Sequence, residues 1–143
     1  MVVLSTFLTV VSGVLVFVLG QLFNEYFLKP IQNYKEIKSK IAYNLTFYAN
    51  LYMNPVENSK KNENIETASQ EIRKLGAEVD AISELRPFGN IFIPKKRILK
   101  KVSKKMIGLS NNFISENQDR AIEYNENARK TIYEMLKINN QEE

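Results

Sequence analysis

Residues 2–23 read VVLSTFLTVVSGVLVFVLGQLF, and this stretch decides how the rest of the chain is arranged. It holds no charged side chain, and most of its positions are Val, Leu or Phe. A helix needs roughly 20 such residues to span a bilayer, and at 1.5 Å per residue this one would cover roughly 33 Å. We therefore expect a transmembrane anchor at residues 1–23.

Two other interpretations of the N-terminal stretch fit less well. A cleaved signal peptide carries Lys or Arg before a shorter apolar core, and small residues at its cleavage site. Here no basic residue precedes Val2, and bulky residues follow Gly20. A buried helix of a soluble protein would have to be enclosed on all sides, and a chain of 143 residues is too small for that.

The basic residues indicate the orientation of this anchor. No Lys or Arg precedes it, whereas four lysines follow it closely: Lys29, Lys35, Lys38 and Lys40. Basic residues that flank a membrane-spanning helix stay on the cytoplasmic side. The sequence thus predicts a protein of a bacterial inner (plasma) membrane, with its N-terminus outside and the bulk of the chain in the cytoplasm. The absence of Cys agrees with a reducing compartment.

One face of the anchor carries small residues: Ser5, Thr9, Ser12, Gly13 and Gly20. At 3.6 residues per turn, these positions fall within about a third of the helix circumference. Small residues let two membrane helices approach closely, so this face is a candidate for self-association into a homo-oligomer. The alternative is an accidental stripe, because small residues are common in membrane helices.

Four further helices are predicted beyond the anchor. Residues 24–30 are expected to form a juxtamembrane hinge, because Pro30 should break or kink the arriving helix at about Lys29. Apolar residues then recur every three or four positions in residues 30–52, 65–85, 95–111 and 117–138. Amphipathic helices with short connections predict an all-α fold, in which residues 31–143 form a cytoplasmic bundle of about four helices.

Turn residues separate the predicted helices. Asn54 and Pro55 end the first of them, and residues 86–90 end the second. Residues 91–93 are the only apolar run that suits a short strand. Gly76 lies in the middle of the second helix, where it should cost about 1 kcal/mol relative to Ala. It is either a tolerated imperfection or the site of a close helix crossing.

A resemblance rests on three segments: PIQ at residues 30–32, IAYNLTFYAN at residues 41–50 and MIGLSNN at residues 106–112. They resemble a group of small bacterial proteins that have one N-terminal membrane helix and a helical cytoplasmic part. The resemblance would cover most of the chain. It implies this architecture and a bacterial inner membrane, and it implies no mechanism, because the group has no assigned activity.

The composition excludes several kinds of site. The chain has no His and no Cys, which rules out a Cys/His zinc site, a nucleophile activated by His and a Glu-x-x-His di-iron motif. No Gly-rich loop followed by Lys-Ser or Lys-Thr is present to hold phosphate.

Tyr43, Tyr48 and Tyr52 are interpreted as core residues. The acids at helical spacing are interpreted as solvated surface: Asp80, Glu84, Glu116, Asp119, Glu123 and Glu126. We therefore predict no catalytic residue, metal or cofactor.

The one feature that suggests binding is a basic helix. Residues 85–115 hold eight Lys or Arg and no acid, and they lie between two acidic segments. Seven of these cations belong to the predicted third helix: Lys95, Lys96, Arg97, Lys100, Lys101, Lys104 and Lys105. A lysine beside an anionic leaflet contributes about 1 kcal/mol before screening. We expect this helix to rest on the inner leaflet or to face it from the bundle. The alternative is a solvated face that pairs with the neighbouring acidic helices.

Together these features predict a non-enzymatic, membrane-anchored interaction or scaffold protein. Its expected partners are membrane lipids, a second copy of the chain and a further protein. A membrane-active effector that oligomerises and perturbs the bilayer is the first alternative, although the anchor lacks the polar face of a pore lining. Binding of an anionic nucleotide or nucleic acid by the basic helix is a further alternative. It is disfavoured because no aromatic residues are interleaved among the lysines.

Overall fold

The structure is helical throughout. The computed structural model describes residues 2–60, 62–85 and 92–138. Helices make up 86% of these residues and none of them forms a strand, so the predicted all-α class is confirmed. The turn predicted at residues 86–90, and the first residue of the apolar run at 91–93, lie outside the described residues.

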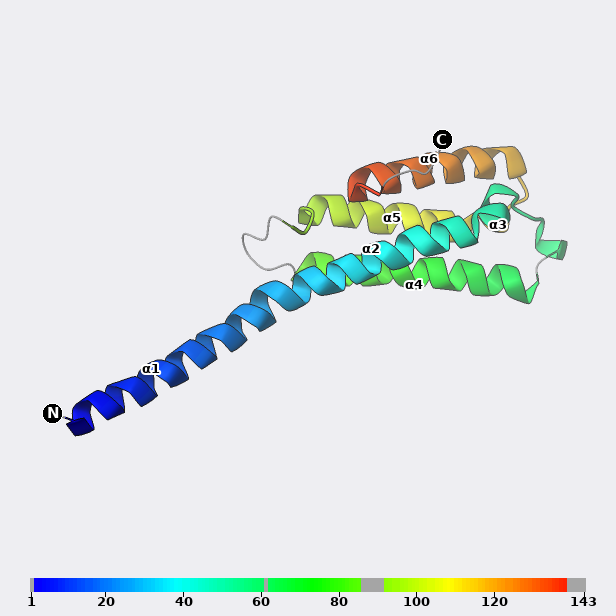
Figure 1. The fold of residues 1–143 in the computed structure, drawn as a ribbon. Coiled ribbons are helices and arrows are strands. Elements are labelled where there is room, and N and C mark those ends of the chain that lie inside the picture. Colours follow the sequence, from blue (N-terminus) through cyan, green and yellow to red (C-terminus); the bar gives the residue numbers. More distant parts are fainter. Residues whose placement is uncertain (1, 61, 86–91, 139–143) are drawn as a thin grey trace.

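Helix α1 (Val2–Phe23) extends away from the rest of the molecule as a rod (Figure 1). All of its side chains that the structure describes are exposed, although most of them are hydrophobic. Within the described residues it lies in the one helix that is long and apolar enough to cross a membrane. A helix suits that setting because its backbone N–H and C=O groups bond to one another and need no water.

Helix α1 passes without interruption into the packed part of the molecule. A π-helical segment, η1 (Asn24–Leu28), follows it and leads directly into α2 (Lys29–Phe47). Helical structure is continuous over the 42 residues from Thr6 to Phe47. Of the two outcomes predicted at Lys29, a break or a kink, the break is therefore wrong.

The π-helical segment explains how a proline fits into this rod. In a regular α-helix, the ring of Pro30 would clash with the carbonyl four residues earlier, and its missing N–H would remove a hydrogen bond. The N–H of Lys29 donates to the carbonyl of Asn24, five residues earlier, which is the wider turn of a π-helix. The widened turn repositions the carbonyls before Pro30. Residues 24–30, expected to be a hinge, are therefore helical.

The first packed helix ends earlier than predicted. Tyr48 leaves the helical conformation, with φ −94° and ψ 12°, before the short helix α3 (Ala49–Met53). After this bend, Tyr52 lies fully buried in the core, and its hydroxyl donates to the carbonyl of Leu45 at 2.6 Å. The single helix predicted over residues 30–52 is thus divided into two.

The later helices lie close to their predicted positions. They are α4 (Glu63–Leu85), α5 (Lys96–Asn111) and α6 (Gln118–Leu136), and a short 3₁₀ helix that was not predicted, η2 (Asn58–Lys60), precedes them. Two of them begin at an asparagine whose side-chain oxygen accepts a backbone N–H, namely Asn62 before α4 and Asn117 before α6. Such caps satisfy donors that have no partner within the helix.

Helices α2, α4, α5 and α6 pack side by side around one core (Figure 1). Each contributes buried residues at helical spacing, among them Ile41, Leu45, Ile72, Val79, Leu99, Val102, Met106 and Ile132. Tyr43, interpreted from the sequence as a core residue, is instead 64% exposed, and Phe47 on the same side of α2 is 63% exposed. Tyr43 lies two positions from both Ile41 and Leu45, which is about 200° around a helix, so it faces away from the core.

Gly76 lies where α4 and α5 approach each other closely. A Cβ atom at this position would be 3.2 Å from Cβ of Met106 and 3.2 Å from Cγ1 of Ile107. It would also be 3.4 Å from the carbonyl oxygen of Ser103. These distances are shorter than most contacts of real Cβ atoms, so the glycine permits the close crossing. Of the two interpretations of Gly76, the structure favours this one.

We predict that Gly76→Leu lowers the free energy of unfolding of the packed helices by about 1–3 kcal/mol, because the added side chain must displace α5. The matched control is Ala77→Leu, at the adjacent exposed position of α4, which should change stability by less than about 0.5 kcal/mol. Thermal unfolding of the full chain in detergent, followed by circular dichroism, measures both. Equal stability of the two variants would contradict the close crossing.

Candidate anion-binding surface

Helix α5 packs against both α4 and α6. Its apolar stripe faces the core, with Leu99, Val102, Met106 and Leu109 buried and Ile98 half-buried. Protein therefore covers the stripe, and it is not available to insert into a bilayer. From the sequence, this helix was expected either to rest on the inner leaflet or to face it from the bundle. The packing is compatible with the second arrangement, in which the helix stays in the bundle and presents its polar face.

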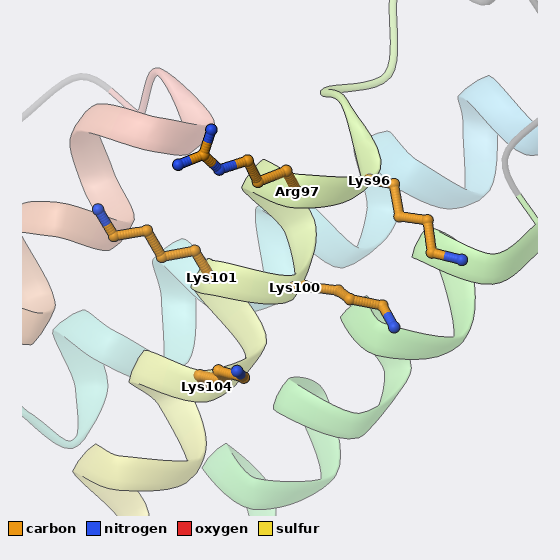
Figure 2. Close-up of a pocket in the computed structure, with 5 residues that line it drawn as sticks. All are labelled: Lys96, Arg97, Lys100, Lys101 and Lys104. Atoms are coloured by element: carbon orange, nitrogen blue, oxygen red, sulfur yellow. The ribbon is translucent and has the colours of Figure 1, made fainter.

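The polar face of α5 carries a cluster of cations (Figure 2). Successive turns contribute five residues that line an open depression of about 590 Å³: Lys96, Arg97, Lys100, Lys101 and Lys104. Lys96 and Lys100 point toward α4, whereas Arg97 and Lys101 extend to the other side of α5 (Figure 2). We call this depression the basic face. A single helix forms it, so it is a surface feature and not an enclosed pocket.

One carboxylate holds the two lysines that point toward α4. Glu84 forms ion pairs with Lys96 and with Lys100, the latter at 2.8 Å. Hydrogen bonds from Lys100 and Lys96 lower the pKa of Glu84 to about 2. Pairing with an acidic neighbouring helix, the alternative expectation for these lysines, thus holds for this part of the basic face. All three side chains are about half exposed, so water screens the pairs.

The rest of the basic face lacks such a partner. Within the described residues, no carboxylate lies within ion-pair distance of Arg97, Lys101 or Lys104. Lys105 does not line the depression, and its Nζ lies over the ring of Tyr124, 4.9 Å from the centroid. Three cations on one helix face that have no ion-pair partner in the described part of the chain form a surface that attracts an anionic partner.

The basic face begins at the end of the packed helices that is closest to α1, which we call the near end (Figure 1). One cavity at this end brings Tyr34 and Lys38 of α2 together with Lys95 and Ile98 at the start of α5. Tyr34 follows Leu28, the last residue of η1, by six positions, or about 9 Å along a helix. The start of the basic face thus lies close to the junction between α1 and the packed helices.

Sequence reasoning missed two cations at the near end as members of a site. Lys38 donates from Nζ to the carbonyl oxygen of Lys137 at 2.8 Å, although 99 positions separate them in the chain. Lys137 ends α6 in a left-handed conformation with φ 52°. In the sequence, Lys38 was used only to infer the orientation of the anchor. For Lys137, the one indication was its position just after the apolar pattern of the last helix.

The small-residue face of α1 is open. A Cβ atom added at Gly13 or Gly20 would meet no atom within 4 Å. The hydroxyl of Ser12 donates to the carbonyl of Thr9 at 2.9 Å, so the helix itself satisfies this polar group. The side chain of Ser5 lies outside what the structure describes. Self-association through this face stays a prediction.

The acidic residues do not gather into a site in the part of the chain that the structure describes. No group of three or more Asp or Glu residues there is placed to hold a metal ion. Glu126 instead pairs with Lys130 at 2.8 Å, one turn along α6. The pair lowers the pKa of Glu126 through hydrogen bonding and charge attraction.

Comparison with known proteins adds no relative. No family model, curated protein or solved structure matches this chain. The resemblance to small bacterial membrane proteins therefore stays a prediction, and a function has to be inferred from the geometry described above.

We predict that the side chain of Glu84 titrates near pH 2, well below its ordinary pKa of 4.5. Because the folded state lowers this pKa, the two ion pairs contribute stability above about pH 4.5 and lose it as the pH falls toward 2. An NMR titration of the full chain in detergent measures the midpoint. In the control variant that combines Lys96→Gln with Lys100→Gln, the midpoint should return toward 4.5. A midpoint of 4.5 in the unaltered protein would contradict the pairing.

Proposed function

We propose that this protein is a non-enzymatic interaction or scaffold module, anchored in a bacterial inner membrane by α1. In this proposal α2–α6 form a bundle in the cytoplasm. The observation that carries it is the 42-residue helix that includes most of α1 and all of α2. Its N-terminal half is apolar and exposed, whereas its C-terminal half packs against α4 and α6. One helix thus joins a membrane segment to the packed helices.

The distribution of cations supports the proposed orientation. Basic residues close to a membrane-spanning helix are retained on the cytoplasmic side. Only the lysines of α2 lie within about 20 residues of α1 and count in this way. Lys95, Lys137 and the start of the basic face add positive charge to the near end once the chain has folded. Because the anchor holds these cations next to the leaflet, even weak attraction to anionic lipid is strengthened by the high local concentration of lipid.

The side of α2 that faces away from the core supports protein binding. Tyr43 and Phe47 stack there with 5.5 Å between ring centroids, and Phe47 also meets the ring of Tyr48 edge-on at 4.9 Å. Aromatic residues are enriched at protein interfaces, because they bury a large area at a small cost in conformational entropy. Phe47 follows Leu28 by 19 positions, so a partner here would lie roughly 28 Å along the helix from the end of η1.

The continuous helix also supports self-association. Small residues on α1 permit close packing with a second copy in lipid. Because α1 and α2 form one rod, two anchors that pack together would hold two sets of packed helices beside each other. No flexible linker would have to be ordered for this second contact, which lowers its entropic cost.

We predict that α1 associates through its small-residue face. The chain has no Cys, so single cysteines report this directly. Thr9→Cys, at the centre of the face, should form a disulfide-linked dimer when native membranes are oxidised. Val11→Cys lies two positions away, about 200° around the helix, and should stay monomeric at a similar depth. Equal crosslinking of the two variants, or none in either, would contradict the proposal.

A further inference from the structure

A cavity of about 610 Å³ lies at the near end, between α2, α5 and α6. Its hydrophobic lining includes Phe92, Ile93, Pro94, Ile98, Met135 and Leu136. Three lysines complete the lining together with Tyr34: Lys38, Lys95 and Lys137. Its volume falls within the range of roughly 300–1,000 Å³ that is typical of small-molecule sites. We call it the near-end cavity.

The charged residues that the structure describes in the lining of the near-end cavity have one sign. Among the described residues that line it, three are lysines and none is Asp or Glu. Lys38 is held in place, since its Nζ donates to the carbonyl oxygen of Lys137 at 2.8 Å. The side chains of Lys95 and Lys137 are exposed, so their ammonium groups can remain in water beside the hydrophobic lining. This arrangement combines apolar surface with cations, as an anionic amphiphile requires.

The position of the near-end cavity relative to α1 indicates where such a ligand would come from. Tyr34 lies about 9 Å along the helix from Leu28, and the headgroup layer on each side of a bilayer is about 5–8 Å thick. Phe92 at the cavity is 67% exposed. An exposed apolar ring at this level can enter the boundary between headgroups and acyl chains, as Phe does in interfacial helices. With α1 in the membrane, the cavity would therefore lie next to the lipid headgroups.

We propose that the near-end cavity binds one anionic phospholipid from the adjacent leaflet. The lysines Lys38, Lys95 and Lys137 contact the phosphate and a charged or hydroxylated headgroup, and the hydrophobic lining contacts the first part of an acyl chain. This inference rests on the proposed membrane anchoring and goes further, because it names a ligand class and a site. The anchor holds the cavity close to its ligand, so even a weak intrinsic affinity is sufficient for occupancy.

The basic face is a weaker candidate for this role. Its depression is formed by side chains of α5 alone, and Glu84 already neutralises part of its charge. The basic face would attract any polyanion. The near-end cavity adds apolar contacts from α5, α6 and the segment before α5, and these contacts select a molecule with a hydrocarbon part. The two sites therefore differ in what they would bind.

The test uses the full chain reconstituted into vesicles of phosphatidylcholine that contain a trace of phosphatidylglycerol with a photoreactive group near the start of an acyl chain. After illumination, mass spectrometry maps the labelled peptides. We expect label at residues 92–98 and 134–137 in addition to α1. Label confined to α1, in protein that has entered the vesicles, would overturn the lipid site while leaving the membrane anchoring intact. Protein that fails to enter the vesicles would instead contradict the proposed function.

Two variants test the two parts of the near-end cavity separately. Met135→Trp fills the hydrophobic lining without changing charge, and the double variant Lys95→Glu with Lys137→Glu reverses two of the cations. We expect Met135→Trp to reduce label at residues 92–98 several-fold. We expect the double variant to reduce it by about 25-fold before screening, since each lysine near an anionic lipid contributes roughly a fivefold change in affinity and two are removed.

The control is Lys60→Glu, a charge reversal in η2 that leaves the near-end cavity unchanged and should leave the label unchanged. Circular dichroism of each variant shows whether the helices remain folded. Equal labelling of all four proteins would overturn the inference. Equal labelling by a phosphatidylcholine probe would also overturn it, because the cavity would then be indifferent to the charge of the lipid. Loss of label on addition of single-stranded DNA or inorganic phosphate would overturn it as well, because the cavity would then prefer a water-soluble anion.

Discussion

The whole arrangement depends on a helix that does not end where the apolar stretch ends. Backbone groups in lipid must bond within the helix, and Pro30 removes a donor just beyond that region. The π-helical segment η1 satisfies both conditions, because its wider turn accommodates the proline while the hydrogen-bonded backbone continues into α2. Consequently α1 and the packed helices are joined by a stiff rod, and the near end of those helices stays close to the junction.

Packing decides which side chains remain available for binding. The close crossing of α4 and α5 at Gly76 buries Val102 and Met106, and this burial contributes far more to stability than the half-exposed ion pairs on the surface. With its apolar stripe enclosed, α5 presents only cations to the outside. Glu84 holds part of them, so the remaining charge is divided between the basic face and the lysine-lined near-end cavity. A depression lined by cations of one helix and a cavity lined by lysines and apolar residues therefore arise at the same end of the packed helices.

Periodicity was sufficient to predict most of the helices, because apolar spacing along α4, α5 and α6 reports which face is buried. It could not predict the π-helical turn, since the rule that proline breaks a helix assumes α-helical hydrogen bonds. Aromatic character suggested burial for Tyr43, but its angular position on α2 places it in solvent. Five cations of the basic face were predicted from one run of sequence. The contact of Lys38 with Lys137 depends on the tertiary fold, and local sequence carries no signal for it.

The central claim is that α1 spans a membrane and holds the packed helices on its cytoplasmic side. The most direct test is the accessibility of a single cysteine, Lys60→Cys in η2, to a membrane-impermeant maleimide. The account predicts that the protein is recovered with the membrane fraction and that the cysteine is labelled only after the cells are opened. Labelling in intact cells, or recovery of the protein in the soluble fraction, would contradict it.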